Sequence, residues 1–245
     1  MKIAIIGAGA MGSLFGGLLQ EADNEVHLVD VWKENVDAIN ENGLKIEGIS
    51  GDRTVRLKAH CKASEIGSCE LVIVFVKSTY TKAAISDSLS LINENTAVMT
   101  LQNGLGNADI LGEVVGKDNV IAGVTSFGST LLGPGKVRHA GSGDTYIGAL
   151  AGMSTRRIEE IAEVLSKSGI QTYNSKDVMS LVWSKLIVNV GINALTALTG
   201  ILNGDLLEHE ETEELLELAV KEAIEVAKVK GIKLINEDPV AHVKE

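Results

Sequence analysis

The stretch KIAIIGAGAMGSLFGGLLQEADNEVHLVD, residues 2–30, decides the fold of the N-terminal part of the chain. It begins with a short apolar run that ends in glycine and continues through an Ala- and Leu-rich segment to about Glu21. A second strand pattern, EVHLVD, completes it at residues 25–30. A strand, a helix and a strand in this order predict one unit of a parallel sheet with a helical crossover.

Three glycines form a GxGxxG pattern where the first strand gives way to the helix: Gly7, Gly9 and Gly12. The first permits the tight turn, the second lets a pyrophosphate approach the backbone, and the third allows close packing of helix on strand. The helix N-terminus then faces the phosphates. We therefore predict a dinucleotide-binding loop made of Gly7, Ala8, Gly9, Ala10, Met11 and Gly12. The alternative is a purely structural strand-to-helix turn.

The second strand ends at Asp30, where an acid is expected to hydrogen-bond the hydroxyls of the adenosine ribose. A carboxylate there repels a 2′-phosphate, and the next residues, Val31 and Trp32, carry no positive charge. The sequence therefore favours NADH over NADPH. The alternative is that Asp30 caps the following helix and that the nearest cation, Lys33, meets a 2′-phosphate.

Strand and helix patterns continue to alternate along the chain: helix 33–42, strand 69–78, helix 80–92 and strand 96–104. The run LVIVFV is apolar on both faces, which is typical of a central parallel strand covered by helices. In residues 119–150, short strands are separated by Gly-rich turns, which predicts an antiparallel extension of the sheet. A helix near 154–168 and a short strand, IQTYNS, follow.

From Asp177 onward the pattern is helical to Gly231, with a break around residues 200–204. We predict an α/β fold: a Rossmann-type doubly wound domain with the antiparallel extension, residues 1–176, then a smaller all-helical domain, residues 177–245. The acidic segment 208–231 is predicted to form an amphipathic helix. Its apolar positions are expected to face the core of that domain: Leu215, Leu216, Ala219, Val220 and Ile224.

Polar side chains follow two of the buried strands. Lys77 comes after VIVFV, and Asn103 comes after VMTLQ. Ligands of open parallel sheets bind beyond the carboxyl ends of the strands, so both side chains are expected to project toward the cofactor.

The segment WSKLIVNVGINALTALTGILNG, residues 183–204, combines an apolar helix with a polar stripe. Lys185, Asn189 and Asn193 are spaced by four and share one face, while the other faces are apolar, so we expect the helix to be buried nearly all round. Burying such groups without partners costs on the order of several kcal/mol. The stripe predicts a polar cleft. The alternative is that these side chains hydrogen-bond buried backbone groups. A lysine that gives a proton to a carbonyl oxygen as hydride arrives, beside neutral amides, suits a small 2-oxo acid.

Composition narrows the class of protein. The chain is 45% hydrophobic and carries a formal net charge of −11, which argues against disorder and against a nucleic-acid partner. We expect no membrane span, no secretion signal and a cytoplasmic location. Cys61 and Cys69 match neither a disulfide framework nor a CxxC metal pattern, so reduced thiols and no metal site are expected. The sequence leaves the oligomeric state open, a homodimer included.

The chain resembles the ketopantoate reductases (2-dehydropantoate 2-reductases) over essentially its whole length. The resemblance rests on five segments: GAGAMG, VKS at 76–78, LQNGLGN at 101–107, WSKLIVNVGINALTAL at 183–198 and LNGDL at 202–206. It implies reduction of the C2 ketone of ketopantoate by NADPH or NADH, giving D-pantoate for pantothenate and coenzyme A synthesis. It also implies a Rossmann-type domain and a helical domain with the site in the cleft between them.

The resemblance further implies roles for single residues. Lys185 would be the general acid at the substrate ketone. The residues expected to hydrogen-bond substrate oxygens are amides: Asn189, Asn193 and Asn203. The residues expected at the nicotinamide end are Lys77, Asn103 and Ser129. Of these, Asn103 would contact both cofactor and substrate, and Ser129 would approach the nicotinamide through its backbone.

Two departures from the family pattern affect what is expected. Members that use NADPH commonly carry an arginine just after the second strand, whereas Val31 follows Asp30 here. The family's substrate-carboxylate serine and its glutamate near the cofactor fall beyond residue 245, so we expect a helical domain incomplete at its C-terminus. The alternatives are a reductase of another small 2-oxo acid and a non-catalytic NAD(H)-binding redox sensor.

Overall fold

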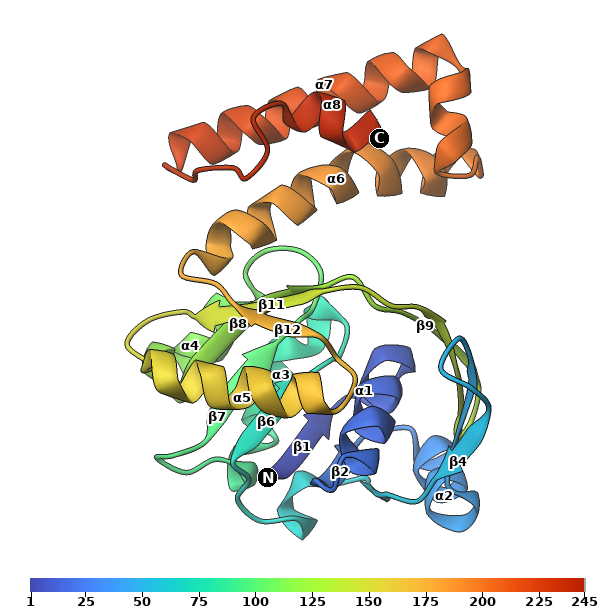
Figure 1. The fold of residues 1–245 in the computed structure, drawn as a ribbon, viewed down its shortest axis with the longest axis vertical. Helices are drawn as coiled ribbons and strands as arrows, with labels where there is room; N and C mark the ends of the chain where they lie inside the picture. Colours follow the sequence, from blue (N-terminus) through green and yellow to red (C-terminus); the bar gives the residue numbers. More distant parts are fainter. Residues whose placement is uncertain (245) are drawn as a thin grey trace. The chain divides into compact units, whose positions relative to one another are not determined.

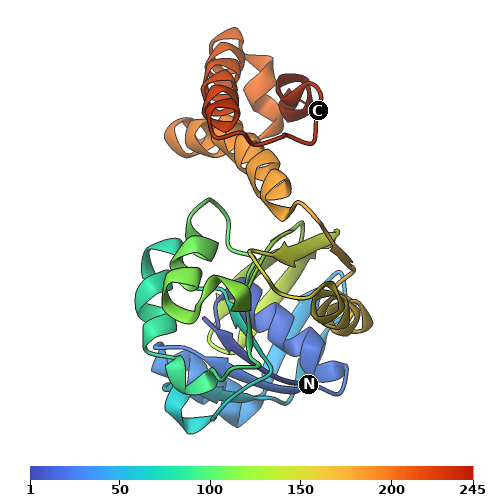
Figure 2. The same ribbon diagram turned by 90° about the vertical axis from the view of Figure 1, so that its left-hand side faces the viewer.

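The computed structural model describes residues 1–244. The chain forms two compact units, Met1–Val178 and Met179–Glu245, which are described separately below. Figures 1 and 2 show the ribbon in two views.

The first unit is built on an eight-stranded sheet in the order β12-β11-β8-β7-β6-β1-β2-β5. The strands are β1 (Lys2–Ile6), β2 (Glu25–Val29), β5 (Lys58–His60), β6 (Leu71–Val74), β7 (Ala97–Thr100), β8 (Val120–Thr125), β11 (Thr145–Ala149) and β12 (Thr172–Asn174). All neighbours pair in parallel except β8 and β11, which are antiparallel. In the register of β1, Ile6 aligns with Val29 and with Val74, so three carboxyl ends lie level at one edge of the sheet.

Helices cover both faces of this sheet, so its central strands β1, β6 and β7 are apolar on both sides. The helices are α1 (Ala10–Glu21), α2 (Lys33–Asn42), α3 (Thr81–Ser86), α4 (Asn107–Val115) and α5 (Thr155–Lys167). Alternate residues of β1 enter different cores: Ile3 belongs to the cluster that contains Phe15 and Leu165, whereas Ala4 belongs to the cluster that contains Leu111. Figure 2 shows α4 in green and α5 in gold on opposite sides of the sheet. The predicted doubly wound α/β architecture is confirmed.

A second sheet of four strands, in the order β4-β3-β10-β9, was not predicted. It consists of β3 (Leu44–Gly48), β4 (Arg53–Val55), β9 (Gly128–Gly133) and β10 (Lys136–Gly141). Of the segment 119–150, only β8 and β11 belong to the main sheet: β8 pairs in parallel with β7, and β11 pairs antiparallel to β8. The hairpin of β9 and β10 instead pairs with β3, since Val137 of β10 aligns with Ile46.

Helix α1 contacts both sheets, and two of its glycines explain how. A Cβ on Gly16 would lie 2.7 Å from Leu28 Cδ2, on the main sheet. A Cβ on Gly17 would lie 2.5 Å from Ile46 Cδ1, on the second sheet. Gly16 and Gly17 therefore let α1 pack closely against the main sheet on one side and against the second sheet on the other.

The expected helix 80–92 is shorter than predicted. Helix α3 ends at Ser86, and a separate 3₁₀ turn, Leu89–Leu91, follows it. The intervening residues, Asp87 and Ser88, are types whose side chains compete with helical backbone hydrogen bonds, which explains the early end.

The second unit contains α6 (Val178–Thr199), a 3₁₀ turn (Gly204–Glu208), α7 (Glu210–Val229) and α8 (Pro239–Lys244). Its core is formed by one side chain of α6, two of α7 and one of α8: Ile187, Leu216, Val220 and Val243. A Cβ on Gly191 would lie 2.9 Å from Val220 Cγ2 and 3.0 Å from Val243 Cγ1, so this glycine lets the helices approach.

Two burial predictions for this unit are wrong. Helix α6 is not buried nearly all round: 28% of its most apolar 18-residue window is buried, and Leu198 is 85% exposed. The described residues of α7 and α8 pack only on the side of α6 that carries Ile187 and Gly191. On α7, Leu216 and Val220 face the core as predicted, but Leu215 is 51% exposed because it lies about 100° around the helix from Leu216.

Helix α6 is also the one helix in residues 1–244 that is long and apolar enough to cross a membrane by length and composition. Length and composition alone do not identify a membrane span, because core helices of soluble proteins share both properties.

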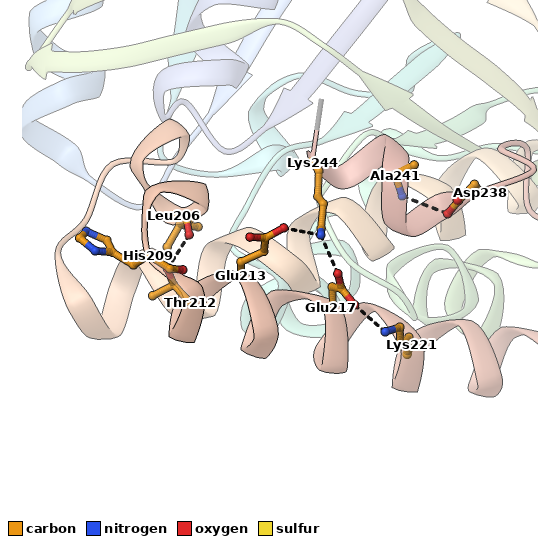
Figure 3. A network of polar contacts seen from close by, with 9 residues as sticks. All are labelled: Leu206, His209, Thr212, Glu213, Glu217, Lys221, Asp238, Ala241 and Lys244. Atoms are coloured by element: carbon orange, nitrogen blue, oxygen red, sulfur yellow. Dashed lines mark hydrogen bonds and ion pairs between the residues drawn. The ribbon is translucent and has the colours of Figure 1, made fainter.

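Lys244 of α8 bridges two glutamates of α7 (Figure 3). Its Nζ lies 2.5 Å from Glu213 Oε1 and 2.6 Å from Glu217 Oε1, and Lys221 Nζ lies 2.5 Å from the other Glu217 oxygen. These two ammonium groups lower the pKa of Glu217 from 4.5 to about 2. The charged form of Glu217 therefore ties the last helix of the described chain to α7.

Replacing Glu217 with glutamine is expected to lower the stability of the second unit modestly at neutral pH. A carboxyl whose pKa is lower in the folded state stabilises that state above its unfolded pKa of 4.5, and the gain is lost as the pH falls toward 2. Thermal unfolding followed by circular dichroism at several pH values should show the gap to wild type closing over that range. Glu222→Gln, an exposed acid on the same helix, is the matched control. A gap that persisted at the acid end would contradict the ion-pair explanation.

Candidate dinucleotide site and polar helix

The glycine loop lies where β1 ends and α1 begins, and the surroundings of each position explain differently why it is glycine. Gly7 has φ +100°, and a Cβ there would lie 2.9 Å from the backbone of Phe75 and Val76. A Cβ on Gly12 would lie 1.8 Å from the Gly7 oxygen. A Cβ on Gly9 would meet nothing within 4 Å, so the space beside it is open. The first turn of α1 carries no acidic residue, as suits a helix N-terminus that receives an anion.

A cavity of about 710 Å³ opens beyond the carboxyl ends of β1, β2, β5 and β6. This volume lies within the range of ligand sites, about 300–1,000 Å³. Four of the predicted cofactor residues line it: Gly7, Gly9, Asp30 and Lys77. The sequence did not point to four further lining residues that follow β5: Cys61, Lys62, Ala63 and Ser64. The position and lining of the cavity fit a dinucleotide whose pyrophosphate lies at the loop.

Both carboxylate oxygens of Asp30 accept hydrogen bonds from backbone amides. Ala8 N donates to Oδ2 at 2.6 Å, and Trp32 N donates to Oδ1 at 2.9 Å. Trp32, not Asp30, is the N-cap residue of α2, and no side chain caps that helix, so the capping role of the alternative is not seen. Each oxygen keeps a second lone pair for a ribose hydroxyl. Lys33, the cation of that alternative, instead pairs with Asp37 at 2.5 Å and is not among the cavity residues.

A hydrogen-bonded set of polar side chains joins the loops that carry Lys77 and Asn103. Gln102 Nε2 donates to Val76 O at 2.5 Å, next to Lys77. Asn107 Nδ2 donates to the Asn103 carbonyl at 3.2 Å. The loops after β6 and β7 therefore hold one another, while the Lys77 and Asn103 side chains themselves are exposed. The sequence prediction missed Gln102 and Asn107, although both belong to the segment LQNGLGN.

Ser129 of β9 donates from its hydroxyl to the Ala10 carbonyl at 3.0 Å. This contact fixes the second sheet against the first turn of α1, beside the glycine loop. The predicted approach of its backbone to the nicotinamide stays a prediction.

The polar stripe lies on α6 of the second unit. Lys185 and Asn189 are partly buried, whereas Asn193 and Asn203 are exposed. Burial lowers the pKa of the Lys185 ammonium from its ordinary value of 10.5, because desolvation disfavours the charged form. The structure thus places the predicted proton donor and amides on the second unit and the predicted dinucleotide residues on the first. Within residues 1–244, no group of three or more His, Cys, Asp or Glu side chains could hold a metal ion.

A parallel sheet with a glycine loop at its carboxyl edge, followed in the chain by a helical unit with a lysine and amide stripe, defines a Rossmann-type dinucleotide-binding protein. The family model "Ketopantoate reductase PanE/ApbA" matches residues 3–152, and the model of that family's C-terminal part matches residues 177–245. The chain belongs to the ketopantoate reductase family.

Individual relatives agree with this assignment. The 2-dehydropantoate 2-reductase of Halobacterium salinarum is 38% identical over 233 residues, which cover 95% of this chain and 77% of that protein. A PanE/ApbA family ketopantoate reductase structure from Ralstonia eutropha has a TM-score of 0.91 at 34% identity, covering 100% of this chain and 79% of that one. A ternary structure of D-mandelate dehydrogenase with NADH and anilino(oxo)acetate has a TM-score of 0.93 at 32% identity, with the same coverage of 100% and 79%.

Proposed function

We propose that the chain is a 2-dehydropantoate 2-reductase that reduces the C2 ketone of ketopantoate to D-pantoate. The observation that carries the proposal is Lys185, a partly buried lysine with a lowered pKa, on the same helix face as Asn189 and Asn193. The family of the chain and the names of its relatives supply the substrate.

A dihydronicotinamide held by the glycine loop, Asp30 and Lys77 would supply the hydride that the C2 carbon needs. Lys185 Nζ donates the proton that the ketone oxygen gains, so the product is an alcohol and the lysine is left neutral. A lowered pKa makes this ammonium a stronger acid, which assists the transfer. The amides of Asn189 and Asn193 hydrogen-bond the substrate oxygens without adding charge, and Asn103 and Asn203 have the same proposed role.

We propose NADH as the favoured cofactor. Asp30 lines the cavity and has a free lone pair on each oxygen for the ribose hydroxyls, and its negative charge opposes a 2′-phosphate. Lys77 and the glycine loop line the same cavity and would hold the rest of the dinucleotide.

Replacing Asp30 with asparagine is expected to raise the ratio of kcat/KM for NADPH to that for NADH by roughly tenfold, because one unit of repulsion is removed. Asparagine has one acceptor oxygen, so one of the two backbone donors loses its partner and a small drop in Tm should accompany the change. Glu41→Gln, an exposed acid on α2, is the control for general charge effects. An unchanged ratio would remove Asp30 from cofactor selection.

A second candidate is the reduction of another small 2-oxo acid, which the likeness to D-mandelate dehydrogenase favours. Steady-state assays with ketopantoate and with phenylglyoxylate, the 2-oxo acid that corresponds to mandelate, distinguish the two. Each is run with NADH and with NADPH. A higher kcat/KM for ketopantoate supports the first proposal, and a higher value for phenylglyoxylate supports the second. Dinucleotide binding without turnover of either would favour the redox sensor. The homodimer and the cytoplasmic location stay predictions.

A further inference from the structure

Strand β5 places the cation Lys62 at the end of the cavity where Asp30 would bind the adenosine ribose. It pairs in parallel with β2, and Val29 aligns with His60. The ladder continues one step further, because Asp30 N donates to the His60 carbonyl at 3.0 Å. The residues after the two strands therefore leave the sheet edge side by side, and Asp30, Val31, Cys61 and Lys62 all line the cavity.

The ammonium of Lys62 is available for a ligand. The side chain is exposed, and no carboxylate within the described residues pairs with it. Asp30 lies on the same wall but has no ion pair with Lys62, and its oxygens already accept the Ala8 and Trp32 amides. Lys33 differs on both counts, since it pairs with Asp37 and does not line the cavity.

We propose that Lys62 binds the 2′-phosphate of NADPH, so that the chain accepts both dinucleotides and the pair Asp30 and Lys62 sets their ratio. A lysine on a flexible four-carbon stem can reach a phosphate that stands off the ribose, and the contact is a charge-assisted hydrogen bond. With NADH bound, the same side chain has no phosphate to meet and stays in solvent. The proposal rests on the proposed function only in taking a nicotinamide dinucleotide as the ligand.

The test is the affinity of Lys62→Ala for NADP⁺ and for NAD⁺, measured by calorimetric titration without any oxo acid. We expect NADP⁺ to bind roughly tenfold more weakly and NAD⁺ to change less than about twofold. Lys62→Arg should keep NADP⁺ binding, and Lys33→Ala should change neither affinity. The contribution of Lys62 to NADP⁺ binding should also shrink in the wild type as the salt concentration is raised, because the charge is exposed.

Three results would overturn the proposal: equal weakening of both dinucleotides in Lys62→Ala, unchanged binding of both, or a selective loss of NADP⁺ in Lys33→Ala instead. Failure of the proposed function gives a different pattern. In that case the Lys62-dependent difference in binding remains, while ketopantoate is not reduced with either cofactor.

Discussion

Replacing Lys185 with alanine is expected to lower kcat by about 10²–10⁴-fold while dinucleotide binding stays close to wild type. The loss is in the chemical step, because the variant has no group on that helix face to give the ketone oxygen its proton. Single-turnover oxidation of NADH, followed by its absorbance, measures the step directly. A fluorescence titration with NADH measures binding in the same samples.

The pH dependence gives this prediction a second readout. A general acid works in its protonated form, so the wild-type rate should fall as the pH rises through the pKa of Lys185. Burial places that pKa below the ordinary value of 10.5. The alanine variant should lack this limb of the profile. Lys233→Ala, an exposed lysine of the same unit, should leave rate and profile unchanged. A Lys185→Ala enzyme that kept its rate would show that another group is the acid.

The main sheet could be predicted because its signals are local. Its central strands β1, β6 and β7 are apolar runs covered on both faces, and most crossovers contain a helix, so the order of these patterns along the chain indicates the topology. The second sheet has no such local signal. Strand β3 pairs with β10 from a distant part of the sequence, and the three residues of β4 are too few for periodicity to distinguish from a loop. Strand β5, at the edge of the main sheet, is equally short and was not predicted for the same reason.

The same distinction explains which site residues were predicted. The glycine loop and Asp30 belong to one continuous motif, and they line the cavity. Lys62 follows β5, and only the pairing of β5 with β2 brings it beside Asp30. For α6, the apolar composition of the faces other than the polar stripe predicted burial nearly all round. Burial depends on which faces other elements cover, and the described helices cover one side.

Exchanging Gly9 for alanine is expected to abolish most dinucleotide binding without damage to the fold, whereas Gly12→Ala should damage the fold itself. Gly9 has φ −70° and ψ −164°, which alanine adopts readily, and its new methyl group would meet no protein atom within 4 Å. That open space is where the pyrophosphate must approach the backbone, so binding should weaken by at least about tenfold. In Gly12→Ala the methyl carbon would lie 1.8 Å from the Gly7 oxygen, so strand and helix must separate.

Thermal unfolding without ligand and NADH titration distinguish the two variants. Gly9→Ala should keep the wild-type Tm and lose affinity, and Gly12→Ala should lose Tm, with any loss of affinity secondary to it. The comparison separates an effect on NADH binding from an effect on folding stability, since both changes add one methyl group to the same loop. If Gly9→Ala bound NADH as tightly as wild type, the phosphates could not lie against this loop. The cavity beyond β1, β2 and β6 would then need another ligand.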